Sequence, residues 1–182
     1  MIEEQATPKL PKRKPNRIPD YDYSQNGAYF VTICTDKMRS MFGEVRRGEA
    51  CPRPQTDERP IIALTPLGKI CEEHIEIISE RFNIEIVNHI IMPNHIHILY
   101  SVDNERATAR VAPTMAKIVG TYKSLVANAW LKEFKKKGIT MGKVFQRGFY
   151  DHVVRDEKNL VRIWEYIEYN PHNWDIKQFY NE

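Results

Sequence analysis

The chain has 182 residues, 42% of them hydrophobic and 28% charged, which is the ordinary balance of one globular domain with appendages. No stretch approaches ~18 consecutive apolar residues, so a transmembrane helix is not expected. Three cysteines without paired spacing argue against a disulfide scaffold and for a reducing cytosol, and a net charge of +3 is too small to indicate a partner.

Residues 1–20 carry four of the eleven prolines and a basic run from Lys9 to Arg17. This composition predicts an extended arm. Basic tails often contact nucleic acid, but the same charges also suit a solvated tail. We expect residues 21–182 to form a single domain.

Runs of β-branched and aromatic residues predict the strands. Polar residues from Glu44 to Pro60 predict a loop or short hairpin that leads into residues 61–64. The tight turn 92–94 joins two of the strands as a hairpin. The strands are expected at residues 29–35, 84–91 and 95–102 and within 143–154.

Apolar residues at three- and four-residue spacing predict three helices. The first begins with Thr65 as N-cap and Pro66 at the first helical position, and a polar loop at 103–112 precedes the second, at 113–134. Asp156 caps the third, which runs through Tyr169 and which Pro171 stops. The expected core-facing residues are Leu67, Ile70, Cys71, His74, Ile77 and Ile78 in the first helix and Leu160, Ile163, Trp164 and Ile167 in the third.

The elements follow one another as strand, helix, hairpin, helix, strand, helix. This order is typical of the split β-α-β arrangement of ferredoxin-like α+β folds. We therefore expect an antiparallel sheet with helices packed on one face, plus a C-terminal helix. Fold class alone implies no function.

The sharpest local feature is His95-Ile96-His97 in a predicted strand. Residues two apart on a strand point to the same face, so the two imidazoles project side by side. Such a pair can bind a divalent metal ion. Taken alone the pattern also suits two half-buried sheet histidines that bond to backbone or water.

Tyr166 and Asn170 are four residues apart on the last predicted helix and share a face that borders its apolar stripe. A hydroxyl and an amide oxygen there could reach a site on the sheet, and an amide oxygen can join two histidines as a third ligand. Spacing alone equally suits Tyr166 as a packing residue and Asn170 as the C-cap of the helix. Tyr169 lies nearly opposite the apolar stripe and should be solvated.

Several short blocks occur together and in order across roughly residues 21–174. Ile91–Leu99 resembles the HUH motif of single-tyrosine transposases, in which a bulky apolar residue separates two histidines. The remaining blocks resemble those of the REP-associated tyrosine transposases within that superfamily: 27–32, 120–124, 145–157 and 166–171.

The resemblance implies that His95 and His97 bind a divalent metal, Mg or Mn, and that Tyr166 is the nucleophile of a metal-dependent DNA-nicking and rejoining enzyme. Asn170 stands where insertion-sequence relatives carry a glutamine as third ligand. The implied substrate is single-stranded or hairpin DNA in the cytoplasm of a bacterial or archaeal cell. The resemblance also implies a possible homodimer in which the tyrosine of each subunit serves the active site of the other.

Lys123, Arg147 and Arg155 could hold DNA phosphates, although each also suits an ordinary surface charge. Tyr122, Phe149 and Tyr150 could stack on unpaired bases, but most of them fit a core better. His152 is a candidate for substrate contact that more readily fits a core histidine. Two rival functions stay open: a hairpin-binding protein that does not cut, and a metal-dependent phosphohydrolase without a covalent step.

Overall fold

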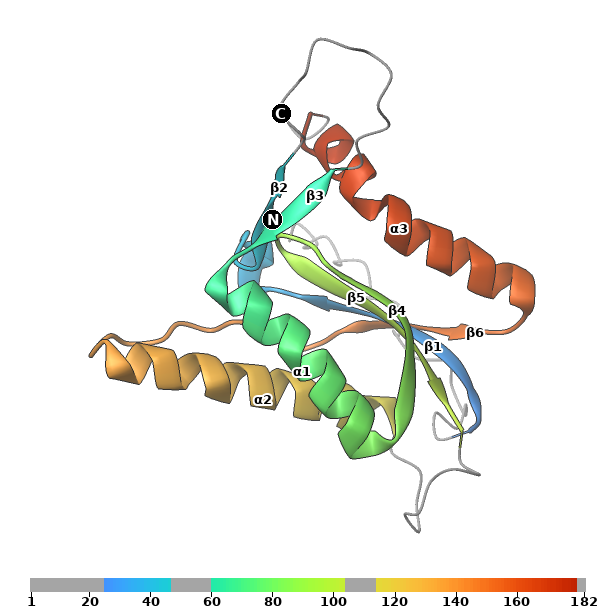
Figure 1. The fold of residues 1–182 in the computed structure, drawn as a ribbon, viewed down its shortest axis with the longest axis horizontal. Coiled ribbons are helices and arrows are strands. Elements are labelled where there is room, and N and C mark those ends of the chain that lie inside the picture. The colour runs from blue at the N-terminus through green and yellow to red at the C-terminus, as the bar shows by residue number, and fades with distance from the viewer. Residues whose placement is uncertain (1–24, 47–59, 104–113, 180–182) are drawn as a thin grey trace, which may run out of the picture.

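The computed structural model describes residues 25–46, 60–103 and 114–179 (Figure 1). The expected arm at 1–20 and nearly all of the expected loop at 103–112 lie outside these residues. The elements are β1 (Gly27–Cys34), the 3-10 helix η1 (Asp36–Met38), β2 (Gly43–Arg46), β3 (Ile61–Leu64), α1 (Pro66–Phe82), β4 (Ile84–Ile91), β5 (His95–Val102), α2 (Met115–Lys136), β6 (Tyr150–Val154) and α3 (Glu157–Phe179).

The main sheet has four strands in the order β4-β5-β1-β6, and all neighbours are antiparallel. This order, with α1 and α2 as the two crossovers, is that of a ferredoxin-like domain, so the predicted fold class is confirmed. β2 and β3 form a separate two-stranded sheet. Most of the segment 44–60, for which a loop or short hairpin was expected, lies outside the described residues.

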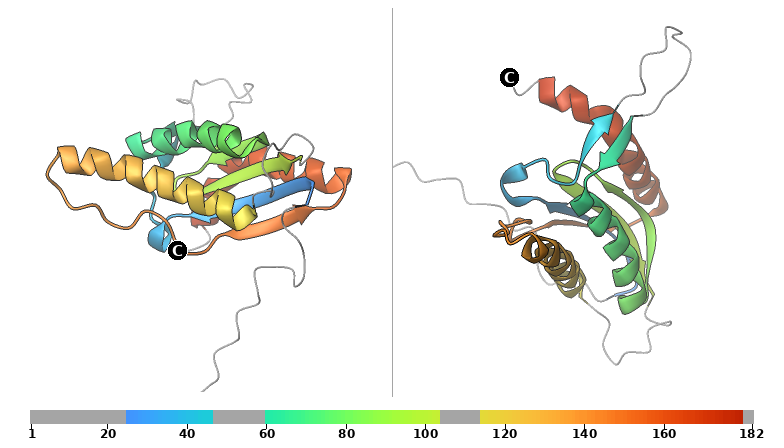
Figure 2. Two further views of the ribbon diagram at one scale, coloured as in Figure 1. Left: turned by 90° about the horizontal axis from the view of Figure 1, so that it is seen from below. Right: turned by 60° about the vertical axis from the view of Figure 1, so that its left-hand side comes forward.

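The two faces of the main sheet carry different helices. α1 and α2 cover one face, and α3 lies across the opposite face (Figures 1 and 2). Side chains alternate along each strand, so Tyr29, Val31 and Ile33 of β1 enter the large core under α1 and α2. Phe30, between them, packs instead with the small cluster formed by Leu99 and α3.

Local capping fixes where the helices begin. The Thr65 hydroxyl accepts a hydrogen bond from the amide of Gly68 at 3.1 Å, with Pro66 at the first helical position as predicted. Asp156 accepts from the amide of Asn159 at 2.7 Å and so caps α3. A Cβ on Gly68 would collide with the carbonyl oxygen of Phe42, so this turn of α1 needs a glycine.

The prediction that Pro171 ends the last helix is wrong, because α3 continues through it to Phe179. Proline lacks the amide hydrogen that would bond to the preceding turn. Pro171 is buried, and it lines a cavity of about 260 Å³ with Ile90 and Ile91 of β4. Burial of the proline ring contributes apolar stabilisation that opposes the loss of this hydrogen bond.

Two residues expected to face the core are exposed: Ile77 and Trp164, at 42% and 45%. The contact of α3 with the sheet is narrow, so Leu160, Ile163 and Ile167 fill it and Trp164 turns to solvent. The strand expected within 143–154 is confirmed as β6. Only Tyr150–Val154 pairs with β1, preceded by a single bridge between Thr35 and Phe145.

Candidate metal and nucleophile site

His95 and His97 lie side by side on β5, as the alternation of strand side chains predicts. Their ring centroids are 4.5 Å apart at an interplanar angle of 69°. Ile96 and Ile98 point to the opposite face, where they are 0% and 2% exposed in the main core. The histidines therefore project from the face that α3 crosses, and His97 is itself buried at 3% exposure.

Each imidazole has a neighbour at its Nδ1 atom. The Thr32 hydroxyl, directly across from His97 on β1, lies 2.9 Å from Nδ1 of His97. The side-chain oxygen of Asn94 lies 2.6 Å from Nδ1 of His95. Because Nδ1 of each ring is engaged, Nε2 is the atom through which either histidine could bind a metal.

α3 brings Tyr166 to the same face. Its ring meets that of His97 edge-on, with centroids 5.2 Å apart at 62°, and meets Phe30 edge-on at 6.1 Å and 87°. Phe30 in turn stacks on His97 at 5.1 Å. Tyr166 remains 42% exposed, so a reactant from solvent can reach the side chain while its ring is held beside His97.

Asn170 and Trp174 continue the row that Tyr166 begins, four and eight residues further along α3. Trp174 lies beside His95, with ring centroids 5.8 Å apart, while Tyr166 lies beside His97. Asn170 lies between them on the same helix face, by its four-residue spacing from each, and is only 6% exposed. Tyr169 is 56% exposed, as expected.

Sequence reasoning missed Trp174, Phe30 and Thr32 as members of this site. Four-residue spacing from Asn170 could have found Trp174, but the expected helix end at Pro171 excluded it. Phe30 and Thr32 depend on the pairing of β1 with β5, which no local pattern in the sequence reveals.

The donor atoms suit a divalent metal ion. Within the described parts of the chain no group of three or more His, Cys, Asp or Glu side chains could hold one, so a third protein ligand here would have to be of another type. The buried amide of Asn170 supplies an oxygen. Two imidazole nitrogens and one amide oxygen suit a Mn or Mg ion that keeps positions open for phosphate oxygens.

The three basic residues expected at the DNA have different environments. Lys123 on α2 donates from Nζ to the carbonyl oxygens of Gln146 at 3.0 Å and Gly148 at 2.5 Å, and burial lowers its pKa to about 8. These bonds tie the segment before β6 to α2. Arg147 and Arg155 are exposed at opposite ends of β6.

Arg147 lies at the end of the sheet that carries His95, because the neighbouring Gln146 amide bonds to the Cys34 carbonyl and Cys34 pairs with His95. Arg155 follows Val154, which pairs with Ala28 at the far end of β1. Of the two arginines, only Arg147 is near the histidine pair.

The other candidates for DNA contact divide into core residues and exposed residues. Tyr122 is 0% exposed and donates to the Cys71 carbonyl at 2.9 Å, so it is a core residue, and Phe149 packs partly buried against that core. Tyr150 is 54% exposed. His152 is exposed and bonds to Asn159 at 3.0 Å, so the expectation of a core histidine is wrong: β6 is an edge strand, and α3 covers only part of it.

A strand-borne histidine pair opposite a helix-borne tyrosine on a ferredoxin-like sheet is the arrangement that the sequence motifs indicated. The family described as "Transposase IS200 like" matches residues 56–170, more than half of the chain. The chain therefore belongs to the IS200-like transposase family.

Two curated proteins are similar to this chain. An uncharacterized protein of Haemophilus influenzae is 28% identical over 92% of this chain and 93% of its own length. A second protein of that organism, named "Putative REP-associated tyrosine transposase", is 28% identical over 50% of this chain and 52% of its own length. The similarity to REP-associated tyrosine transposases that the motifs indicated is thus confirmed.

A solved REP-associated tyrosine transposase bound to a REP hairpin covers 87% of this chain and 75% of its own, with a TM-score of 0.49 and 16% identity. Separately, no helix among the described residues is long and apolar enough to cross a membrane.

Proposed function

We propose that this protein nicks and rejoins single-stranded or hairpin DNA in a metal-dependent reaction that passes through a 5′-phosphotyrosine on Tyr166. The observation that carries the proposal is the approach of Tyr166 to His97, at 5.2 Å between ring centroids, on the face where His95 also lies. Membership of the IS200-like transposases supports the same reaction.

In the proposed site His95, His97 and Asn170 would hold a Mg or Mn ion. Such an ion would supply Lewis-acid polarisation of a non-bridging oxygen of the scissile phosphate and would offset the charge that develops in the transition state. Tyr166 is 42% exposed, so a DNA phosphate could approach its hydroxyl from solvent. Asn170 would contribute its amide oxygen from a buried position.

Tyr166 loses its phenolic proton and attacks the phosphorus. The new bond joins the tyrosine oxygen to phosphorus, the bond to the 3′-oxygen breaks, and the departing 3′-oxygen takes up a proton. The 5′-phosphotyrosine keeps the energy of the phosphodiester. A 3′-hydroxyl can therefore attack it in the reverse direction, release the tyrosine and rejoin a strand without ATP.

Single-stranded or hairpin DNA is the proposed substrate because the phosphate must enter the space beside Tyr166. Arg147 is exposed at the end of the sheet that carries His95, so it would contact the DNA strand where that strand leaves the site. We place the protein in the cytoplasm, where chromosomal DNA is available to it.

The test is a denaturing gel with labelled oligonucleotides and Mn, in which wild-type protein should remain covalently attached to the 5′ end of the product. Tyr166→Phe should form no adduct, and Tyr169→Phe, a matched change three residues further along α3 at a more exposed position, should form it normally. Cleavage without any adduct would favour a hydrolase. Binding of hairpins without cleavage would favour a recognition protein.

Within one chain, Tyr166 lies beside the His97 of that same chain, so we propose catalysis in cis. The alternative is a homodimer in which each α3 serves the other subunit. Mixing Tyr166→Phe with His97→Ala protein separates the two cases. In cis the mixture stays inactive, whereas exchange of α3 between subunits would restore part of the adduct.

A further inference from the structure

The turn that precedes β5 brings the side chain of Asn94 against His95. Asn94, the last residue of this turn, is held by three hydrogen bonds. Its carbonyl oxygen accepts from the Thr35 amide at 2.9 Å and from the Thr35 hydroxyl at 3.0 Å. Its side-chain nitrogen donates to the carbonyl oxygen of Met38 at 3.3 Å.

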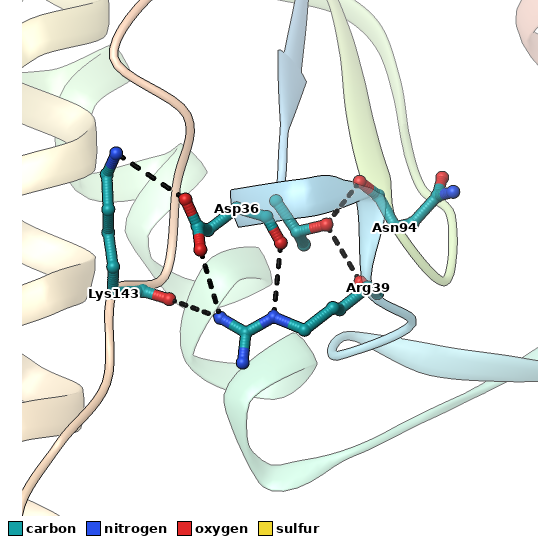
Figure 3. Close-up of polar contacts among 5 residues, drawn as sticks. Asp36, Arg39, Asn94 and Lys143 are labelled. Atoms are coloured by element: carbon teal, nitrogen blue, oxygen red, sulfur yellow. Dashed lines mark hydrogen bonds and ion pairs between the residues drawn. The ribbon is translucent and has the colours of Figure 1, made fainter.

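The contact with Met38 sets the orientation of the Asn94 amide. A backbone carbonyl oxygen only accepts hydrogen bonds, so the side-chain atom that faces it must be the nitrogen. The oxygen of the same amide then faces Nδ1 of His95 at 2.6 Å. Figure 3 shows this amide directed away from the network of Asp36, Arg39 and Lys143 that braces the neighbouring turn.

The Met38 carbonyl is itself held in place by an unusual backbone. Lys37 and Met38 are non-glycine residues with φ of 56° and 54°, a conformation that L residues rarely adopt. The turn is braced because Arg39 donates to the carbonyl of Asp36 at 3.1 Å and to that of Lys143 at 2.8 Å. Lys143 forms an ion pair with Asp36 at 3.4 Å.

These contacts dictate which nitrogen of His95 carries the proton. An amide oxygen cannot donate, so Nδ1 of His95 must be the donor, and in the neutral ring Nε2 then carries the lone pair. We propose that Asn94, oriented by the Met38 carbonyl, is a positioning residue that fixes His95 as its Nδ1–H tautomer with Nε2 ready to bind the metal. This inference rests on the metal site of the proposed function.

His97 differs in this respect. Its Nδ1 neighbour is the Thr32 hydroxyl, which can either donate or accept. The structure therefore fixes the tautomer of His95 more strictly than that of His97. The turn after β1 reaches His95 through the Met38 carbonyl and Asn94.

The experiment is ¹⁵N NMR of the histidine rings in the metal-free, full-length protein, which distinguishes the two tautomers directly. Wild-type His95 should show a protonated Nδ1. Asn94→Ala should lose this signature, and Asn94→Asp, which keeps an acceptor oxygen, should retain it. A matched change on the same sheet face, Asn88→Ala, removes a bond to Glu168 and should leave His95 unchanged.

Binding of Mn alone, followed by electron paramagnetic resonance, gives the second measurement. Asn94→Ala should bind Mn about 10–100-fold more weakly than wild type, and Asn94→Asp should recover most of the loss. A protonated Nε2 on wild-type His95, or equal behaviour of the Ala and Asp variants, would overturn the inference. A chain that shows the Nδ1–H tautomer but forms no DNA adduct would refute the proposed function and leave this inference standing.

Discussion

The ring of Tyr166 meets the ring of His97 edge-on, across the gap between a helix and the middle of a sheet, with Phe30 touching both. Two residues 69 positions apart in the sequence are thus held within one small site. Because the contact is between rings, it does not need the tyrosine hydroxyl, which stays available for chemistry.

This relationship predicts that metal binding and adduct formation can be separated. Tyr166→Phe should bind Mn as tightly as wild type, since the ring contact with His97 persists, yet should form no adduct. His97→Ala should lose both. Calorimetric titration with Mn, beside the gel assay, provides the measurement. Weak Mn binding by Tyr166→Phe would instead make the phenol a metal ligand.

Two glycines should respond to alanine with opposite signs. Gly68→Ala places a Cβ against the Phe42 carbonyl, so it should destabilise the fold by about 1–3 kcal/mol. Gly120→Ala, in α2, meets no atom within 4 Å and should stabilise it by about 0.5–1 kcal/mol, because alanine favours a helix. Urea unfolding of both variants gives the free energies. Equal effects would mean that the Gly68 turn can shift.

The buried amine of Lys123 predicts a pH-dependent contribution to stability. Its pKa is lowered to about 8 by burial, whereas the unfolded chain holds the proton to about 10.5. Between these values the unfolded state binds more protons, so the contribution of Lys123 to stability rises as the pH increases from about 8 to about 10.5.

The comparison is between wild type and Lys123→Met in urea, at pH 7 and at pH 9.5. The free energy of unfolding of wild type, relative to that of Lys123→Met, should be larger at the higher pH. The cost of burying the ammonium disappears there, while the bonds to Gln146 and Gly148 remain. Lys132→Met, an exposed change on the same helix, should show no such growth. A wild-type advantage that shrinks with pH would contradict the assignment.

Arg147 and Arg155 should differ as phosphate contacts. Arg147→Ala should weaken binding of single-stranded DNA and lower the slope of log K against log salt by about 1, because one phosphate contact is lost. Arg155→Ala, at the far end of β6, should have the smaller effect. Fluorescence anisotropy across a salt series measures both. A larger effect of Arg155→Ala would mean that the bound DNA strand runs along β6 towards Arg155 instead.

Alternation and helical spacing were enough to predict the strands, the shared face of His95 and His97, and the row of Tyr166 and Asn170. These patterns could not show that the histidine pair on β5 and the Tyr166 row on α3 lie close together. The face of the sheet that a terminal helix covers depends on long-range packing. The helix end predicted at Pro171 was wrong for a related reason, because the local preference of proline was outweighed by burial near Ile90 and Ile91. Trp174 was not predicted as a site residue because it follows this expected helix end.

Lys123 shows the same limit for charged residues. A lysine on an amphipathic helix normally faces solvent, where it could meet a phosphate. Its acceptors here are two backbone carbonyls from a segment more than 20 residues away, which become visible only once the chain has folded.

Because α1 and α2 pack on one face of the sheet and the candidate site occupies the other, neighbouring residues of β1 serve separate purposes. Tyr29, Val31 and Ile33 maintain the fold, while Phe30 and Thr32 shape the site. Evolution can therefore alter the chemistry of such a domain at every second position of one strand and leave its architecture intact. A library that randomises only those alternate codons would sample new activities on an unchanged scaffold.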